Sequence, residues 1–153
     1  MKNISILGLG NISFELCSAL LKQGFNVFGS TDNYDRQVRL KKIGVKVFSR
    51  SNIDQCILKA DKLIITVPPD NFGCKIIKTY SKEIIDSNVR WIGYLSSTSV
   101  YGNYNGEEVT ENSKLRPKES LEKNRVKAEQ DLLDFGTKYS ILIEIFRLSG
   151  IYG

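Results

Sequence analysis

Short runs of hydrophobic residues alternate along the whole chain with longer segments in which hydrophobic and polar positions are mixed. The short runs are rich in Ile, Val and Leu and predict strands buried on both faces, whereas the mixed segments have the length and spacing of helices. Six strands are expected, at residues 4–7, 26–28, 45–48, 63–67, 89–95 and 139–146. Helices are expected at residues 12–23, 34–43, 53–59 and 74–86, and over the charged segment that ends near residue 135.

This alternation predicts the fold class. Strand–helix–strand units join parallel strands by right-handed crossovers, which puts helices on both faces of the sheet. We predict an α/β fold with a doubly wound, six-stranded parallel Rossmann sheet in the order 3-2-1-4-5-6. Gly24 and Gly44 end two of the helices, and Pro68-Pro69 ends the fourth strand because proline has no amide to donate. A polar loop is expected at about 102–117, between the fifth strand and the last helix. Residues 1–153 are predicted to form one domain.

Composition narrows the function classes. The net charge of +5 comes from lysines and arginines scattered along the chain, which favours a solvated surface over a nucleic-acid-binding patch. No hydrophobic run approaches the ~20 residues of a membrane span, and the N-terminus does not resemble a signal peptide, so we expect a cytoplasmic protein. The three widely spaced cysteines are expected to be buried free thiols. The absence of histidine excludes a Ser-His-Asp triad within this chain and argues against a metal site.

The first predicted strand ends in Gly8-Leu9-Gly10-Asn11-Ile12-Ser13, which matches Gly-x-Gly-x-x-Gly except for Ser13 at the third glycine. In such a turn the first glycine allows the change of direction and the second lets the backbone approach a diphosphate. The amides at the start of the helix then face the phosphates. We predict that Gly8, Gly10, Asn11 and Ile12 bind NAD or NADP. The alternative is a tight turn without a ligand.

The ends of the second and fourth strands complete the predicted cofactor site. Asp32 follows the second strand, where an acidic residue binds the ribose hydroxyls of NAD, but it could equally be the N-cap of the next helix. Arg36 and Arg39 are close enough in sequence to leave NADP open. Ligands of these folds bind outside the carboxyl ends of the strands. Thr31 is predicted to line the cofactor crevice, together with Val67 and Pro68.

A cluster of hydroxyl residues follows the fifth strand, and several motifs accompany it. They read Ser-Ser-x-x-Val-Tyr-Gly at 96–102, Val-Thr-Glu at 109–111, Lys-Ala-Glu at 127–129 and Phe-Arg-Leu-Ser-Gly-Ile-Tyr-Gly at 146–153. With them, essentially the whole chain resembles the extended short-chain dehydrogenase/reductase family of nucleoside-diphosphate-sugar epimerases and dehydratases. The spacing of its Gly-x-Gly and its double proline resemble the atypical branch of that family. The resemblance implies an NAD(P) cofactor, a sugar-nucleotide substrate and isomerase or oxidoreductase chemistry.

The resemblance also assigns roles to individual residues. In that family a serine orients the substrate oxygen, a tyrosine is the general acid and base, and a lysine four residues later binds the nicotinamide ribose. The matching positions are Ser97, Leu121 and Arg125. Leucine cannot transfer a proton, whereas arginine can still donate to a ribose, so the usual proton relay is absent. Tyr101 or Tyr104 could replace it. Ser97 has an alternative interpretation as a turn residue that ends the strand.

Three functions are compatible with this sequence. The first is an NAD(P)-dependent enzyme of the sugar-nucleotide epimerase or reductase type. The second is a non-catalytic dinucleotide-binding or redox-sensing module, and the third is a remnant that no longer binds cofactor. The family normally continues past the final motif into a substrate-binding section, so we expect a fragment or a reduced form here. The sixth strand would then leave a free sheet edge, and self-association into a homo-oligomer is a hypothesis. No nucleic-acid or membrane partner is expected.

Overall fold

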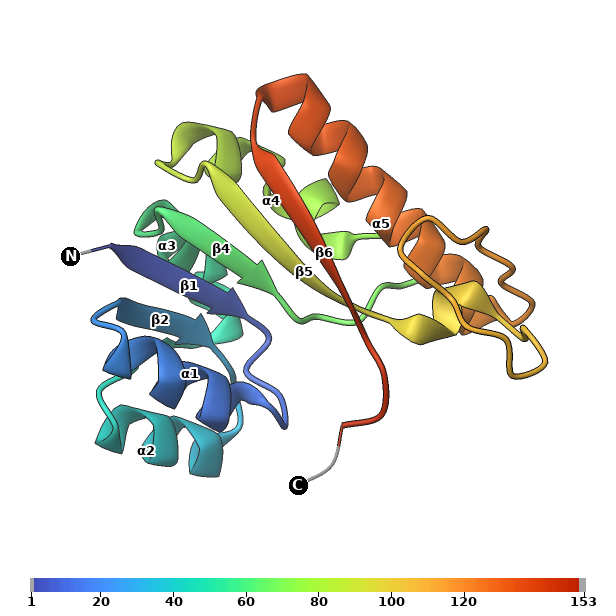
Figure 1. Cartoon of the computed structure of the whole chain (residues 1–153). Coiled ribbons are helices and arrows are strands. Elements are labelled where there is room, and N and C mark those ends of the chain that lie inside the picture. The colour runs from blue at the N-terminus through green and yellow to red at the C-terminus, as the bar shows by residue number, and fades with distance from the viewer. Residues whose placement is uncertain (1, 152–153) are drawn as a thin grey trace.

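A computed structural model describes residues 2–151 and contains one six-stranded sheet (Figure 1). The strand order is β3-β2-β1-β4-β5-β6, and every neighbouring pair is parallel, which confirms the predicted topology. The strands are β1 (Asn3–Leu7), β2 (Asn26–Ser30), β3 (Lys46–Phe48), β4 (Lys62–Ile65), β5 (Trp91–Ser97) and β6 (Leu142–Leu148). The order reverses between β1 and β4, so the crevice between their carboxyl ends is where a doubly wound fold binds its ligand.

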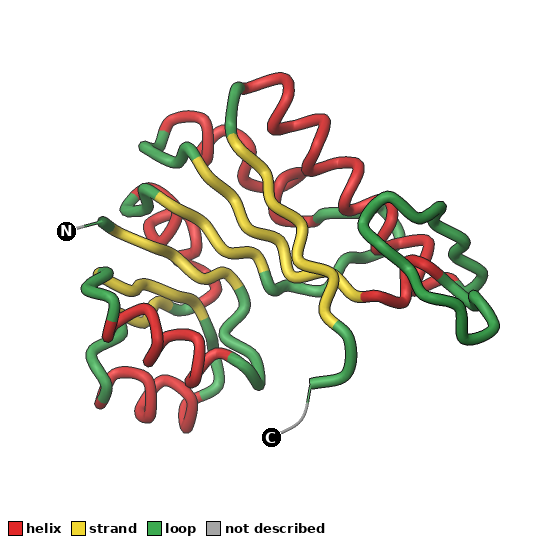
Figure 2. Tube along the Cα trace, viewed as in Figure 1, coloured by secondary structure: helices red, strands yellow, loops and turns green. Residues whose placement is uncertain are grey.

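Helices cover both faces of the sheet (Figure 1). Helices α1 (Ser13–Lys22) and α2 (Tyr34–Lys42) lie on one face, and α3 (Ile53–Leu58), α4 (Lys75–Asp86) and α5 (Ser120–Tyr139) lie on the other. Two short 3-10 turns, η1 (Arg50–Asn52) and η2 (Thr98–Tyr101), follow β3 and β5. Residues 102–119 then form a long loop that projects past the sheet (Figure 2).

Two hydrophobic cores hold the layers together, because successive side chains of a strand point to opposite faces. In β1, Ile4 and Ile6 pack toward α1 and α2, whereas Leu7 packs toward α3 and α4. Ser5 also points to the α3 side and is fully buried, and its hydroxyl donates to the Cys56 carbonyl at 2.7 Å. That hydrogen bond ties the central strand to a helix and satisfies a polar group that would be costly to bury alone.

Several predicted boundaries were wrong by a few residues, and one residue that was predicted to lie in a strand lies in a helix. Tyr139, expected to begin the sixth strand, is the last residue of α5. Helix α5 continues about four residues beyond its predicted end near residue 135, and it stops at Tyr139 because Ser140 adopts a left-handed conformation with φ 56°. Residues 98–101, which the sequence left unassigned, form η2, and α4 is interrupted at Tyr80 by non-helical backbone.

Strand β6 is an edge of the sheet, and its outer residues are exposed. Leu142 and Phe146 are 59% and 41% exposed on the face that α1 and α2 cover elsewhere. Within residues 2–151, no helix lies over β5 and β6 on that face (Figure 1). Among the same residues, no helix is both long enough and hydrophobic enough to cross a membrane.

The cysteines generate the first prediction. All three are buried free thiols, as expected, and burial raises the pKa of Cys17 to about 12 and those of Cys56 and Cys74 to about 11. Only the thiolate reacts, so a raised pKa leaves about one molecule in a thousand or fewer reactive at pH 8. We expect no reaction with a disulfide reagent in the native protein and three equivalents of reaction in urea. Rapid native labelling at pH 8 would contradict this burial.

Candidate cofactor site

The turn between β1 and α1 depends on Gly8. Its φ is +98°, and a Cβ atom there would lie 2.7 Å from Thr66 Oγ1 and 2.9 Å from Val67 Cγ2. The Thr66 hydroxyl donates to the carbonyl oxygens of Leu7 and Gly8, and its amide donates to Leu7 at 2.9 Å. No other residue type fits both the dihedral angle and the close approach of β4. The first glycine is therefore required by the protein's own packing.

Gly10 differs from Gly8 in a way that bears on function. A Cβ atom at Gly10 would meet only the Gly8 carbonyl oxygen, at 3.9 Å, so the protein leaves room for a side chain. Among residues 2–151, no hydrogen bond uses the amides of Asn11 or Ile12, whereas Ser13 caps the turn by donating to the Gly10 carbonyl. The packing of the protein does not require a glycine at position 10, and the two neighbouring amides have no partner. Both features are expected where the backbone approaches an anionic group closely.

Two cavities meet at this turn. One has a volume of about 560 Å³ and extends from the turn toward the ends of β2 and β3, and the other, of about 430 Å³, extends toward the ends of β5 and β6. Gly10, Thr66 and Pro68 line both. Together the two cavities bring together most of the predicted residues, namely Gly8, Gly10, Asn11, Ile12, Thr31, Val67, Pro68, Ser97 and Arg125.

Asp32 lies beside the first cavity rather than in it. Its carboxylate accepts a hydrogen bond from the Arg50 amide at 2.8 Å, and its second oxygen lies 3.8 Å from Arg50 Nε. The N-cap interpretation of Asp32 is wrong, because Asn33 caps α2 by accepting from the Arg36 amide at 2.9 Å. Arg50 belongs to η1, 18 residues away, and nothing local in the sequence indicated this contact.

The first cavity also contains residues that the sequence analysis missed. Arg50 and Lys75 contribute positive charge, while Ile53, Ile76 and Tyr80 give an apolar wall. Lys75 is the first residue of α4, and Tyr80 lies at the interruption of that helix. A slot with apolar walls beside positive groups suits an adenine ring and its phosphorylated ribose.

The second cavity contains the candidate catalytic serine. Ser97 and Arg125 both line it, as the family resemblance implies. The Ser97 oxygen accepts from the Ser99 amide at 3.2 Å, so it also starts η2, but its hydroxyl proton is not used by that bond. Leu121, at the tyrosine position, is 75% exposed on the first turn of α5. Among residues 2–151, Arg125 is the only residue lining this cavity with a charged side chain.

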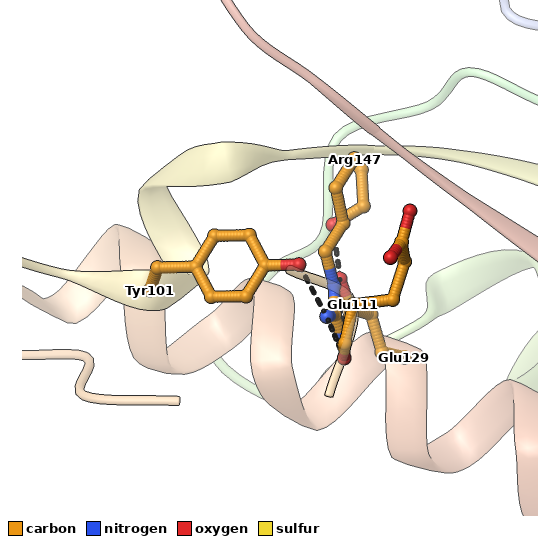
Figure 3. A network of polar contacts seen from close by, with 5 residues as sticks. Tyr101, Glu111, Glu129 and Arg147 are labelled. Carbon is orange, nitrogen blue, oxygen red and sulfur yellow. Dashed lines mark hydrogen bonds and ion pairs between the residues drawn. The ribbon is translucent and has the colours of Figure 1, made fainter. Parts of the chain in front are cut away.

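Tyr101 lies in a separate environment, in a network of polar contacts (Figure 3). Its hydroxyl accepts from Arg147 Nη1 at 2.9 Å, and it lines a third cavity, of about 700 Å³, against β6 and residues 109–111. Arg147 also donates to both carboxylate oxygens of Glu129, with the shortest contact 2.8 Å long. The buried Ser96 hydroxyl donates to Glu129 at 2.6 Å. Tyr101 is therefore held away from the cavity that contains Ser97.

Within this network, the negative charge of Glu129 is balanced by the positive charge of Arg147. Glu129 is 3% exposed and, within the described residues 2–151, forms an ion pair with Arg147 alone. The pKa of Arg147 is raised above its usual range mainly by its hydrogen bonds to Glu129. Arg147 also donates to the Glu111 carbonyl at 3.3 Å, which anchors the long loop. Three elements, β5, α5 and β6, are thus joined through one ion pair. No three potential metal ligands cluster anywhere among the described residues.

The glycine turn, the free amides and the paired cavities at the switch point of the sheet define an NAD(P)-binding Rossmann domain. The model of the family described as NADP oxidoreductase, coenzyme F420-dependent, matches residues 3–84, and the chain belongs to this family. NAD(P) is accordingly the cofactor of the site.

Individual relatives are longer than this chain. Protein YeeZ of Escherichia coli (strain K12) is 27% identical over 177 residues, which cover all of this chain and 60% of that protein. A conserved protein of unknown function from Silicibacter pomeroyi is 28% identical with a TM-score of 0.86, over all of this chain and 55% of the other. UDP-glucuronic acid 4-epimerase from Bacillus cereus, solved with NAD, is 17% identical with a TM-score of 0.82, over 99% of this chain and 57% of the other. That last likeness shows the shared fold.

The buried ion pair generates the second prediction. Glu129→Ala leaves Arg147 unpaired, which typically costs about 3 kcal/mol and lowers Tm by roughly 6–12 °C. Lys78→Ala is the control, because the half-exposed pair of Lys78 and Asp131, 3.2 Å apart, should contribute less than about 1 kcal/mol. Thermal unfolding of both variants tests this. Equal losses would contradict the role given to Glu129, and a Glu129→Leu, Arg147→Met double variant should recover stability.

Proposed function

We propose that this chain is the dinucleotide-binding domain of a protein related to the sugar-nucleotide epimerases and reductases of the extended short-chain dehydrogenase/reductase family. The Gly10 turn carries the proposal, because its open Cβ position and the neighbouring free amides have no role in the protein's own packing. The solved NAD complex of the Bacillus cereus epimerase supports it through the shared fold. The part of the longer relatives that this chain does not match would supply the substrate pocket.

Each part of the cofactor has candidate partners. The amides of Asn11 and Ile12 would bind the diphosphate, and Thr31, Val67 and Pro68 would line the adenosine side. Arg125 would donate to the nicotinamide ribose, and Ser97 would orient a carbonyl or hydroxyl beside the ring. The bound nicotinamide would supply hydride transfer. These residues bind and orient, and none of them supplies the proton that epimerisation or carbonyl reduction requires.

The second candidate is a non-catalytic dinucleotide-binding or redox-sensing module. Leu121 favours it, since the family resemblance assigns this exposed leucine to the position of the catalytic tyrosine. The two candidates differ in turnover and not in binding. Addition of nucleoside-diphosphate sugars to the cofactor complex, with nicotinamide absorbance as the readout, separates them. Turnover would support an enzyme, whereas tight binding without turnover would support the module.

The third prediction uses the contrast between the two glycines. Gly10→Ala should leave Tm within about 1 °C of the parent, because the structure has room for the methyl group, but should weaken NAD(P)H binding at least about tenfold. Fluorescence titration of the reduced cofactor and thermal unfolding measure the two effects. Lys22→Ala is the control, because Lys22 is exposed in the last turn of α1 and lines neither cavity. Unchanged affinity in Gly10→Ala would overturn the proposed function.

A further inference from the structure

One hydroxyl in the core lacks a hydrogen-bond partner. Tyr94 of β5 is 1% exposed, and within residues 2–151 its oxygen is one of two buried side-chain oxygens that make no hydrogen bond. A buried hydroxyl without a partner costs free energy, and a phenylalanine of nearly the same shape would avoid that cost. The packing of the core therefore gives no reason for a tyrosine at this position.

Tyr94 faces helix α5. Side chains alternate along a strand, so Tyr94 and Ser96 point to the same face of the sheet, where Ser96 donates to Glu129 of α5. Tyr94 belongs to the same hydrophobic core as Ala128 of that helix. Arg125 precedes Ala128 by three residues and Glu129 by four, so it lies on the same, sheet-facing side of α5.

The pKa of Tyr94 reflects the groups around its hydroxyl. Burial is the largest cause and raises this pKa to about 12, and the neighbouring Cys74 and Glu129 act in the same direction. Arg125 opposes them, through its charge and as a nearby hydrogen-bond donor. Because the phenol oxygen makes no well-aligned hydrogen bond, the Arg125 guanidinium lies close to it without being bonded to it.

Arg125 is not held by a carboxylate. The ion pairs within residues 2–151 use the cations of Arg50, Lys78 and Arg147, and Arg125 forms none. Its side chain lines the second cavity together with Ser97. A guanidinium carries five N–H donors in one plane, so it can donate one of them to the phenol oxygen and direct others to a ligand.

We propose that Tyr94 is a positioning residue of the cofactor site, which holds the Arg125 guanidinium toward the nicotinamide ribose by accepting one of its N–H groups. The inference rests on the proposed function and adds to its site a residue that lines neither cavity. The hydrogen bond closes when the dinucleotide binds, since contacts that are poorly aligned in an unliganded site tighten in the complex. Tyr94 therefore acts on the cofactor only through Arg125.

The experiment is a double-mutant cycle of Tyr94→Phe and Arg125→Leu, read by fluorescence titration of NADH and of NADPH. Tyr94→Phe should weaken the dinucleotide that binds by about fivefold, the effect of one hydrogen bond to a charged group. In the Arg125→Leu background the same change should alter affinity less than about 1.5-fold, because the hydroxyl then has nothing to position. Equal losses in the two backgrounds would overturn the inference.

Thermal unfolding separates this role from a structural one. Tyr94→Phe removes a hydroxyl that has no partner, so Tm without cofactor should stay the same or rise. Tyr104→Phe is the matched control, because the Tyr104 hydroxyl donates to the Lys114 carbonyl at 2.7 Å and Tyr104 lines neither cavity. This control should leave dinucleotide affinity unchanged. A lower Tm of Tyr94→Phe with unchanged affinity would show that the hydroxyl serves the core alone, against the inference.

The parent protein distinguishes failure of this inference from failure of the proposed function. If the parent binds a dinucleotide but Tyr94→Phe binds it equally well, the positioning role of Tyr94 is wrong and the proposed function stands. If the parent binds neither NADH nor NADPH, the proposed function is wrong and this inference fails with it.

Discussion

The contact between Gly8 and the end of β4 determines the geometry of the site. The backbone of Gly8 lies against Thr66 and Val67, so close that even a methyl group would overlap them. The Thr66 hydroxyl bonds the carbonyls on either side of the bend, which fixes the direction in which the chain leaves β1. Because β1 and β4 flank the reversal of strand order, this one contact sets where α1 begins and where both cavities meet.

A second constraint acts on the other half of the sheet. Glu129 and Arg147 form a buried ion pair that joins α5 to β6, with Ser96 of β5 and Tyr101 of η2 bonded to its two ends. Burial of an ion pair is seldom favourable in itself, but it defines one arrangement of the groups around it. Here that arrangement holds α5 against β5 and β6, the elements whose residues Ser97 and Leu148 line the second cavity together with Arg125.

The sequence was sufficient for the topology because the strands are hydrophobic runs that alternate with segments of helical length, and Gly8, Gly24, Gly44 and Pro68 mark several of the boundaries between them. It was also sufficient for the glycine turn, whose residues act through their own backbone. The sequence could not predict the contact that Asp32 makes, because its partner Arg50 belongs to a different strand–helix connection. The Glu129–Arg147 pair is likewise invisible to periodicity, since the residues belong to separate elements. The end of α5 depended on the backbone of Ser140, which no hydrophobic pattern encodes.

The uncovered face of β6 bears on how this chain behaves in isolation. Leu142, Glu144 and Phe146 alternate with inward residues and so share that face, which leaves a carboxylate between two exposed hydrophobic side chains. If two copies stacked through these faces, their Glu144 carboxylates would be buried close together. The free-energy cost of burying these like charges would oppose the gain from hydrophobic contact. The carboxylate of Glu144 therefore disfavours stacking of two copies through this face.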